Sequence, residues 1–383
     1  STFSARLLAL ALVRGSLALK GGHWLSKDVH ICMATDEPNP QGAAAVIRSA
    51  LKNTKYPSRL KFHVVCPAEV CDAIKAAIPE ANGCLDLRQP PAELEERLAG
   101  TLRLARSTKK RTLNSPFNVI PSYIPTIFAD LHASKLIYLD DDTLVVSDIT
   151  ELAAIDMGKY AVAAVEDCQA QFNETISFDR VRTALAQRSG QKPDYSKVGP
   201  KTCIMNRGVF VVNVPQWKNL HVTEEMDWWM VQHMLNPKLW HRGVSQPPWL
   251  LAVGAIGYKR LPEAWNVRGC GWSTGGQVLW DQSAELRAKD VNTLNAVRKL
   301  GTDLSHVKVT ASTLDARIIH YSGNNKPWSK TPCGVSLCSV RRGRYKLQNA
   351  RCPAMPVQGG WHMIVECQDI WRSEMHEARP ARS

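Results

Sequence analysis

Three consecutive aspartates, Asp140 to Asp142, follow an apolar run at residues 135–139. Alternate side chains of an extended chain share a face, so Asp140 and Asp142 should face together while Asp141 points elsewhere. Two carboxylates held this close repel each other unless a cation compensates, and Mn²⁺ or Mg²⁺ prefers such oxygen ligands. Because α/β sheets bind ligands at strand ends, the run predicts a metal site; a solvated acidic turn is the alternative.

A second candidate group follows the apolar run at residues 316–319. His320 can complete a metal site with two aspartates. Gly323 would let the backbone approach a ligand closely, and Lys326 would offer a point charge to a phosphate. Alone this arrangement is weak evidence, but its coincidence with the acidic run favours a site for a metal and a diphosphate.

The surrounding sequence alternates short apolar runs with helical stretches, which is typical of an α/β sheet. We expect strands at residues 29–34, 60–65, 135–146, 161–165 and 209–214, and helices at 42–53 and 223–235. Thr223 is positioned to cap the second helix. The aspartates and His320 would then lie at the ends of buried strands.

The chain has 383 residues and a net charge of +13, enough for one large domain or two ordinary ones. Residues 1–27 and 97–112 contain basic but no acidic side chains, and residues 331–383 contain eight basic and four acidic ones. The charge excess therefore lies outside the candidate site. No nucleic-acid recognition motif accompanies it, so we expect no nucleic-acid partner; anionic membranes or acidic glycans fit better.

Eleven cysteines indicate the oxidising secretory pathway. The apolar stretch from Phe3 to Leu19 is too short and too basic to span a membrane, and it could be a signal-peptide core or an interfacial helix. Membrane anchoring would come from this segment or from upstream. The four cysteines of the tail, residues 331–383, could form two disulfides, with a zinc site as the rival.

Several blocks, in order, resemble the glycosyltransferases of family 8. The similarity covers residues 28–330 and is greatest to the animal glycosyltransferase 8 domain-containing proteins, then to plant galacturonosyltransferases. The blocks include His30 to Asp36, Tyr138 to Asp142, Asn206 to Asn213, Trp265 to Arg268, and His320 to Gly323 with Lys326 to Trp328.

This resemblance implies a type-A glycosyltransferase fold: one Rossmann-like nucleotide-sugar domain with a mostly parallel central sheet. It implies a retaining transfer from a UDP-sugar donor, with Mn²⁺ (or Mg²⁺) bound, to a glycan, glycoprotein or glycolipid hydroxyl in the Golgi or another secretory lumen. The implied metal ligands are Asp140, Asp142 and His320. The implied donor-binding residues are Ala34, Thr35, Asp36, Asp141, Gly208, Gly323 and Lys326, and the implied catalytic residues are Gln246 and Asn206.

The chain also departs from the family pattern. Pro121 takes a position where the family usually has arginine, and Arg207 stands between Asn206 and Gly208 where alanine or proline is usual. Arg207 could replace the missing charge or block the sugar pocket, so a nucleotide-sugar-binding pseudoenzyme or assembly partner is the alternative function. By resemblance, we further expect a disulfide between Cys168 and Cys203.

Overall fold

The computed structural model describes residues 28–105, 115–190, 193–240, 243, 245–268, 316–322, 326, 328, 340–341 and 344–345. The expectations for the N-terminal segment 1–27, for Gly323 and for the cysteines of the tail lie outside the described residues. Within the described part, no helix has both the length and the apolar character needed to cross a membrane.

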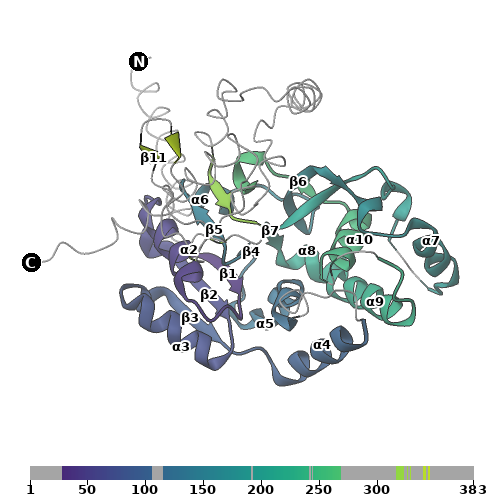
Figure 1. Ribbon diagram of the computed structural model, residues 1–383, viewed down its shortest axis with the longest axis horizontal. Coiled ribbons are helices and arrows are strands. Elements are labelled where there is room, and N and C mark those ends of the chain that lie inside the picture. Colours follow the sequence, from purple (N-terminus) through teal and green to yellow (C-terminus); the bar gives the residue numbers. More distant parts are fainter. Residues whose placement is uncertain are drawn as a thin grey trace, which may run out of the picture.

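A seven-stranded sheet in the order β3-β2-β1-β4-β7-β6-β8 forms the centre of the molecule (Figure 1). Four of its pairings are parallel, β1–β2, β2–β3, β1–β4 and β6–β8, whereas β7 runs antiparallel to both β4 and β6. Its strands are β1 (Val29–Ala34), β2 (Leu60–Val65), β3 (Leu85–Arg88), β4 (Lys135–Leu139), β6 (Val162–Gln171), β7 (Cys203–Asn213) and β8 (Lys259–Arg260). The predicted mostly parallel α/β sheet is confirmed.

Helices cover both faces of this sheet, so its inner strands read as nearly continuous apolar runs. One core contains residues of α2 (Gln41–Lys52), α3 (Ala68–Ala77) and α6 (Thr150–Ala153). The core of the opposite face contains residues of α4 (Ala92–Ala105), α5 (Ile124–Ile127), α7 (Phe178–Gln187), α8 (Val214–Asn219), α9 (Val222–Leu235) and α10 (Gln246–Ile256). Trp229 and Trp249, both fully buried, anchor that second core.

A second sheet of three strands begins just after β4 in the chain. It consists of β5 (Thr143–Val145), β10 (Ile318–His320) and β9 (Val267–Arg268), with β10 in the middle. β10 pairs antiparallel with β5, which places His320 opposite Thr143, and in parallel with β9. Two further short strands, β11 (Val340–Arg341) and β12 (Arg344–Tyr345), pair with each other.

Two expectations about local structure need correction. The predicted strand 135–146 is interrupted at residues 140–142, where the chain passes from β4 into β5 of the other sheet. Thr223 does not cap α9, because His221 occupies the N-cap position. The Thr223 hydroxyl instead donates to the carbonyl of Ser122 and accepts from the indole N–H of Trp217. Tertiary partners therefore replaced the local cap.

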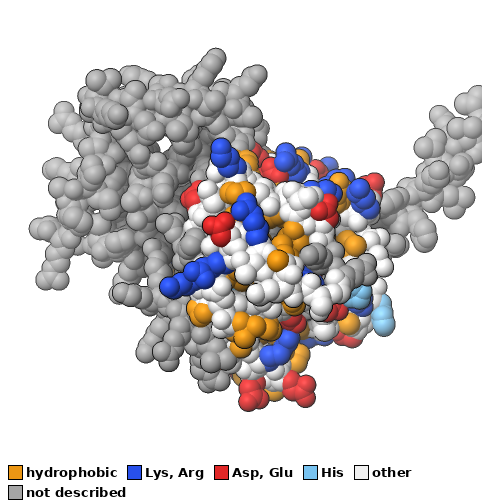
Figure 2. All heavy atoms as spheres, turned by 90° about the vertical axis from the view of Figure 1, so that its right-hand side faces the viewer, with side chains coloured by type: hydrophobic (Ala, Val, Ile, Leu, Met, Phe, Trp, Pro, Cys, Tyr) orange, Lys and Arg blue, Asp and Glu red, His pale blue; other side chains and the backbone are white. Residues whose placement is uncertain are grey.

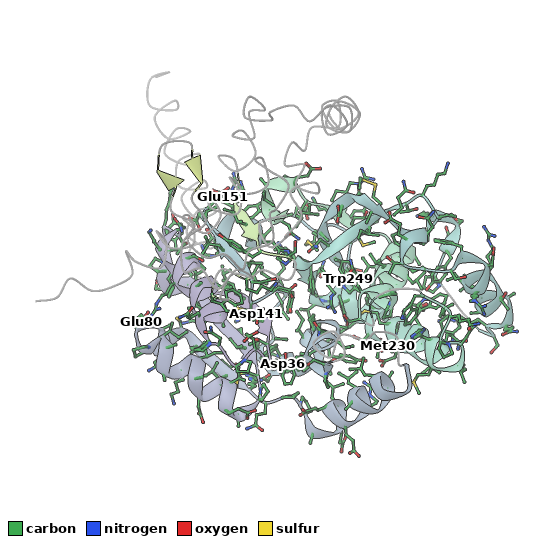
Figure 3. The ribbon with its side chains drawn as sticks, viewed as in Figure 1. Asp36, Glu80, Asp141, Glu151, Met230 and Trp249 are labelled. Carbon is green, nitrogen blue, oxygen red and sulfur yellow. A yellow bond between two sulfur atoms is a disulfide. The ribbon has the colours of Figure 1, made fainter. Side chains whose placement is uncertain are left out.

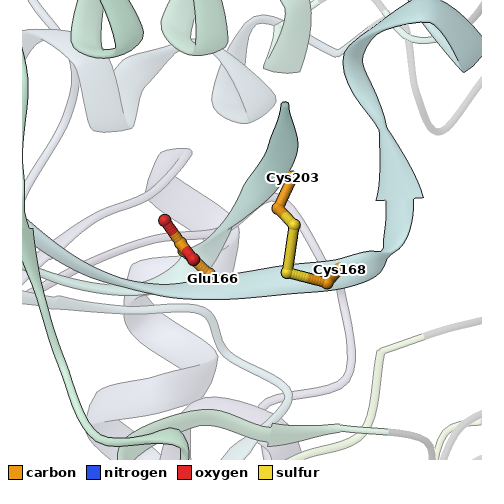
Figure 4. Close-up of side chains that lie close together, drawn as sticks. All are labelled: Glu166, Cys168 and Cys203. Carbon is orange, nitrogen blue, oxygen red and sulfur yellow. A yellow bond between two sulfur atoms is a disulfide. The ribbon is translucent and has the colours of Figure 1, made fainter. Parts of the chain in front are cut away.

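The expected disulfide between Cys168 and Cys203 is present and joins β6 to β7, with Cα atoms 4.5 Å apart (Figure 4). A second bond, between Cys66 and Cys71, ties the end of β2 to α3 and was not predicted. Cys32 is a fully buried free thiol and packs as a small apolar residue.

Candidate active site

The acidic run lies where the central sheet changes direction. β4 pairs in parallel with β1 on one side and antiparallel with β7 on the other. The backbone N–H of Asp140 continues the β7 pairing by donating to the carbonyl of Gly208 at 2.8 Å. Ligands of open α/β sheets bind beyond the carboxyl ends of strands at such a reversal, so the fold places these aspartates at its ordinary ligand site.

Asp140, Asp142 and His320 come together there and each can offer one ligand atom to a metal ion. These atoms all lie within 4.8 Å of one another. The Nε2 atom of His320 is 3.1 Å from Oδ1 of Asp142 and 3.8 Å from Oδ2 of Asp140. Oδ1 of Asp142 is buried and has no hydrogen-bond partner. A buried unpartnered carboxylate oxygen beside an imidazole and a second carboxylate fits a divalent cation.

Asn266 orients His320 for this role. Its side-chain oxygen lies 3.0 Å from Nδ1 of His320. Because an amide oxygen only accepts, this contact assigns a proton to Nδ1 and turns Nε2 toward the carboxylates. Metal-binding histidines are characteristically held in this way. Sequence reasoning assigned no role to Asn266, although it belongs to one of the blocks that resemble the family.

The hydrogen-bond chain continues from Asn266 to β7. The Asn266 amide donates to Oδ1 of Asn206 at 3.0 Å, and the same oxygen accepts from the backbone N–H of Gly208 at 2.8 Å. The predicted catalytic residue Asn206 is thereby joined to His320 through one intermediate side chain. The amide of Asn206 has a fixed orientation, because its oxygen faces two donors.

An irregularity in β7 brings Asn206, Arg207 and Gly208 to the site. Ala164 of β6 pairs with Phe210, but Glu166 pairs with Met205, so the single β6 residue between them lies opposite a longer stretch of β7. Such bulges redirect side chains and are frequent next to active sites.

Gly208 provides the space in which the metal-ligand residues meet. A Cβ built on Gly208 would lie 2.1 Å from Cε1 of His320 and 2.8 Å from Oδ2 of Asp140. No real side chain tolerates contacts this short. Glycine is therefore required here by close approach, and the role of Gly208 as a donor-site residue stays a prediction.

Asp141 points away from this cluster, as the strand alternation predicted. Thr35, which follows β1, donates a hydrogen bond from its hydroxyl to Oδ2 of Asp141. Desolvation and the neighbouring charge of Asp142 raise the pKa of Asp141 to about 7. Asp141 and Asp36 lie in the middle of the molecule in Figure 3, between the α2–α3 side and the α9–α10 side.

The positive charge of Lys326 compensates the negative charge of Asp142. Its ammonium group pairs with Oδ2 of Asp142 and also donates to the carbonyl of Tyr321 at 3.0 Å. Burial would raise the pKa of Asp142, but His320 and Lys326 together hold it far below its usual range. Asp140 shows the opposite behaviour, because burial and the charge of Asp142 raise its pKa. The ionised form is thus favoured at Asp142 and disfavoured at Asp140.

Arg207 projects from the same bulge toward the segment η4 (Pro116–Asn118). Its guanidinium donates to the backbone carbonyl of Asn118. Burial lowers the pKa of Arg207, and the charge of Asp140 opposes this effect. The hydroxyl of Tyr138 donates to Oδ1 of Asp140 at 2.8 Å. The positive charge introduced by Arg207 therefore lies close to one of the candidate metal ligands.

The remaining predicted residues lie around this centre. Ala34 is the last, buried residue of β1, and the exposed Asp36 accepts from the hydroxyl of Ser115 at 2.5 Å. Gln246 is half-buried at the first position of α10. Among the described residues, no hydrogen bond or ion pair joins Gln246 to the aspartates, so its catalytic role stays a prediction. Gly323 lies outside the described part of the chain.

Comparison with known proteins agrees with this arrangement. The model of the family described as "Glycosyl transferase family 8" matches residues 30–331. The chain belongs to glycosyl transferase family 8. Among similar curated proteins, probable galacturonosyltransferase-like 10 of Arabidopsis thaliana is 26% identical over 314 residues, which cover 80% of this chain and 74% of the relative. Probable galacturonosyltransferase-like 4 of the same plant is also 26% identical, over 80% of this chain and 76% of its own length.

Two solved glycosyltransferase structures share this fold. The galactosyltransferase LgtC, in complex with donor and acceptor sugar analogues, superimposes with a TM-score of 0.51 at 16% identity, covering 90% of this chain and all of LgtC. The bifunctional enzyme WbbM gives a TM-score of 0.50 at 17% identity, over 79% of this chain and 47% of its own. The predicted type-A glycosyltransferase fold is confirmed, and the chain is a glycosyltransferase.

Proposed function

We propose that this glycosyltransferase moves a hexose or uronic acid from a UDP-sugar to a hydroxyl of a glycan, glycoprotein or glycolipid, with retention of anomeric configuration. The observation that carries the proposal is the group of Asp140, Asp142 and His320, in which a buried carboxylate oxygen lacks a partner. We propose Mn²⁺ as the bound ion, with Mg²⁺ as the substitute. When bound, the ion supplies charge neutralisation for the departing diphosphate.

Individual side chains of the protein would orient the metal ligands and bind the donor. His320 presents Nε2 because Asn266 holds its other nitrogen, and Asp142 is kept ionised. Lys326, already beside Asp142, offers a second positive charge to the diphosphate oxygens. Thr35 and Asp36, at the end of β1, are proposed to contact the uridine. These groups are preorganised toward the charge that develops on the leaving UDP, which is where electrostatic stabilisation is most effective.

Asn206 is proposed to lie beside the donor sugar, with Gln246 nearby at the start of α10. For retention we propose substitution on the front face of the sugar. The fixed amide of Asn206 can orient the sugar, while the acceptor hydroxyl is positioned on the side from which UDP leaves.

Release of UDP from a panel of UDP-sugars tests the proposal directly. We expect turnover that requires added Mn²⁺ and that falls at least 100-fold in Asp142→Asn, because the variant removes charge from a candidate ligand. Asp156→Asn, a carboxylate in the loop before β6, is the matched control and should keep full activity. Metal-independent turnover, or an active Asp142→Asn, would refute the metal site.

Arg207 favours one alternative function, that of a protein which binds a nucleotide sugar but does not catalyse transfer of the sugar. Its charge lies near Asp140, where it competes with a cation for the same carboxylate. Binding of UDP–Mn²⁺ without turnover of any donor would support this alternative. The double variant Pro121→Arg with Arg207→Ala then discriminates: turnover that appears in the variant would identify the wild type as an impaired enzyme.

We place the protein in the lumen of the Golgi or another secretory compartment, associated with the membrane. The two disulfides among the described cysteines are consistent with an oxidising environment.

A further inference from the structure

A pocket of about 320 Å³ lies at the edge of the central sheet, away from the aspartates and His320. It is lined by residues of the turn before β6, of β8, of η8 (Tyr195–Lys197) and of the C-terminal end of α10. Its volume is in the range of small-ligand sites. Nothing in the transferase mechanism uses it.

The charged side chains around the pocket are mainly cationic. Lys159, Lys197 and Arg260 line it, with Glu166 as the single carboxylate. The carboxylate of Glu166 is already engaged, because its Oε1 accepts from Nε of Arg260 at 2.6 Å and from the hydroxyl of Tyr258. Lys159 and Lys197 are exposed, and neither pairs with a carboxylate among the described residues, so both charges can meet an anion; the ammonium of Lys159 lies 5.7 Å from the centre of the Tyr160 ring.

The remaining lining is suited to a sugar ring. Tyr160 and Tyr258 both line the pocket; Lys159 lies over the ring of Tyr160, so the ring of Tyr258 is the aromatic surface on which an apolar sugar face can pack. The lining also includes the C-terminal end of α10, with Gly254, Ile256 and Gly257. The last carbonyl groups of a helix have no partners within that helix. Such carbonyls accept hydrogen bonds from hydroxyl groups but repel a bare anion. The combination of cations, tyrosines and helix-end carbonyls matches a molecule that carries both hydroxyls and a negative charge.

We propose that this pocket binds an acidic saccharide, a sugar ring that bears a carboxylate, as part of the acceptor chain. Met205 lines the pocket and immediately precedes Asn206, so the same strand connects the pocket to the candidate active site. The role as an acceptor-holding site rests on the proposed transferase function. The binding of the saccharide does not, and it can be measured separately.

Calorimetric titration of the full chain with trigalacturonic acid, in the absence of UDP-sugar and Mn²⁺, tests the binding. We expect saturable binding that weakens with salt, and at least tenfold weaker binding of the methyl-esterified trisaccharide, which keeps the rings and loses the charge. Lys159→Gln with Lys197→Gln should weaken binding of the acid about tenfold. Lys218→Gln with Lys238→Gln removes the same charge from exposed lysines elsewhere and should leave binding unchanged.

Two further measurements separate this pocket from the donor site. Asp142→Asn should bind the trisaccharide as tightly as the wild type, and excess UDP with Mn²⁺ should not displace it. Any of four results would overturn the proposal: displacement of the trisaccharide by UDP, equal binding of the ester, equal losses of affinity in both lysine pairs, or no binding at all. If transfer activity is absent but the expected binding pattern holds, the pocket stands and the proposed function fails.

Discussion

Single residues decide the geometry of the metal-ligand cluster, and two of them are not ligands. Gly208 leaves room for His320 and Asp140 to approach each other, and Asn266 sets which nitrogen of His320 faces the carboxylates. Gly208 and Asn266 act by placing His320 and contribute no charge to the metal-ligand cluster. Their replacement should therefore affect metal binding more than it affects the fold.

Asn266→Ala should weaken Mn²⁺ binding about 10- to 100-fold, the usual cost of losing a partner that orients a ligand histidine. His320 would lose its acceptor at Nδ1 and could present the wrong tautomer. Titration with Mn²⁺, followed by electron paramagnetic resonance, measures the change. Asn173→Ala, an exposed asparagine in the turn after β6, is the control and should bind Mn²⁺ normally. Equal affinity in both variants would contradict the orienting role.

Gly208→Ala should abolish Mn²⁺ binding, because the new methyl group would occupy the space of the His320 ring. The shift that follows should also lower the free energy of unfolding by about 1–3 kcal/mol. Gly83→Ala is the matched control, since a Cβ at Gly83 meets nothing within 4 Å. Urea unfolding and the same Mn²⁺ titration distinguish the two; a Gly208→Ala protein that binds Mn²⁺ normally would refute this account.

At the scale of elements, the pairing of β6 with β7 determines how β7 presents its residues to the site. The bulge in β7 presents Asn206 and Gly208, and the disulfide between Cys168 and Cys203 closes the ends of the two strands just beyond it (Figure 4). This bond encloses a sequence separation of 35 residues, whereas the bond between Cys66 and Cys71 encloses only five.

Loop length predicts different contributions of these two disulfides to stability. In the chain-entropy model, the bond between Cys168 and Cys203 should contribute about 3–4 kcal/mol and the bond between Cys66 and Cys71 about 2 kcal/mol. Paired Cys→Ser variants, compared by urea unfolding, measure both. Each variant is the control for the other, and a larger loss for Cys66→Ser with Cys71→Ser would contradict the entropic explanation.

At the scale of the whole molecule, charges of both signs are mixed on one face, and a buried histidine links folding to pH. The face that carries α7 and α10 shows Lys and Arg side chains interspersed with Asp and Glu (Figure 2). On α9, His233 is 1% exposed, stacks on Trp240 with ring centroids 3.8 Å apart, and has no hydrogen-bond partner at either nitrogen. Burial lowers the pKa of His233 to about 4.

The stability of the protein should therefore decrease under acidic conditions. Above pH 6.5 His233 is neutral in both states and has no effect. Between pH 6.5 and about 4 the unfolded chain takes up a proton that the folded chain rejects, so the free energy of unfolding falls by roughly 2–3 kcal/mol. Urea unfolding at pH 7 and pH 4.5 measures this. His233→Phe should lose part of the pH dependence, and the exposed His221→Gln should keep all of it; equal slopes would exclude His233 as the cause.

Much of the architecture was readable from the sequence. The runs at residues 29–34 and 60–65 coincide with β1 and β2, because an apolar run bounded by polar residues has few other ways to be buried. The acidic run and the ordered blocks identified Asp140, Asp142 and His320 as one site. The apolar runs are local features of the sequence, and their burial is sufficient to place the strands. The site residues were assigned from the acidic run and from the resemblance to the family.

Tertiary structure alone decided the rest. The roles of Asn266 and Gly208 depend on distances between β4, β7, β10 and the turn before β9, segments far apart in the chain. The interruption of the predicted strand at residues 140–142 arises because β5 pairs with β10 and not within the central sheet. Periodicity reports which side of an element is buried. It does not report which partner covers that side, because pairing and register are settled only when the whole core packs.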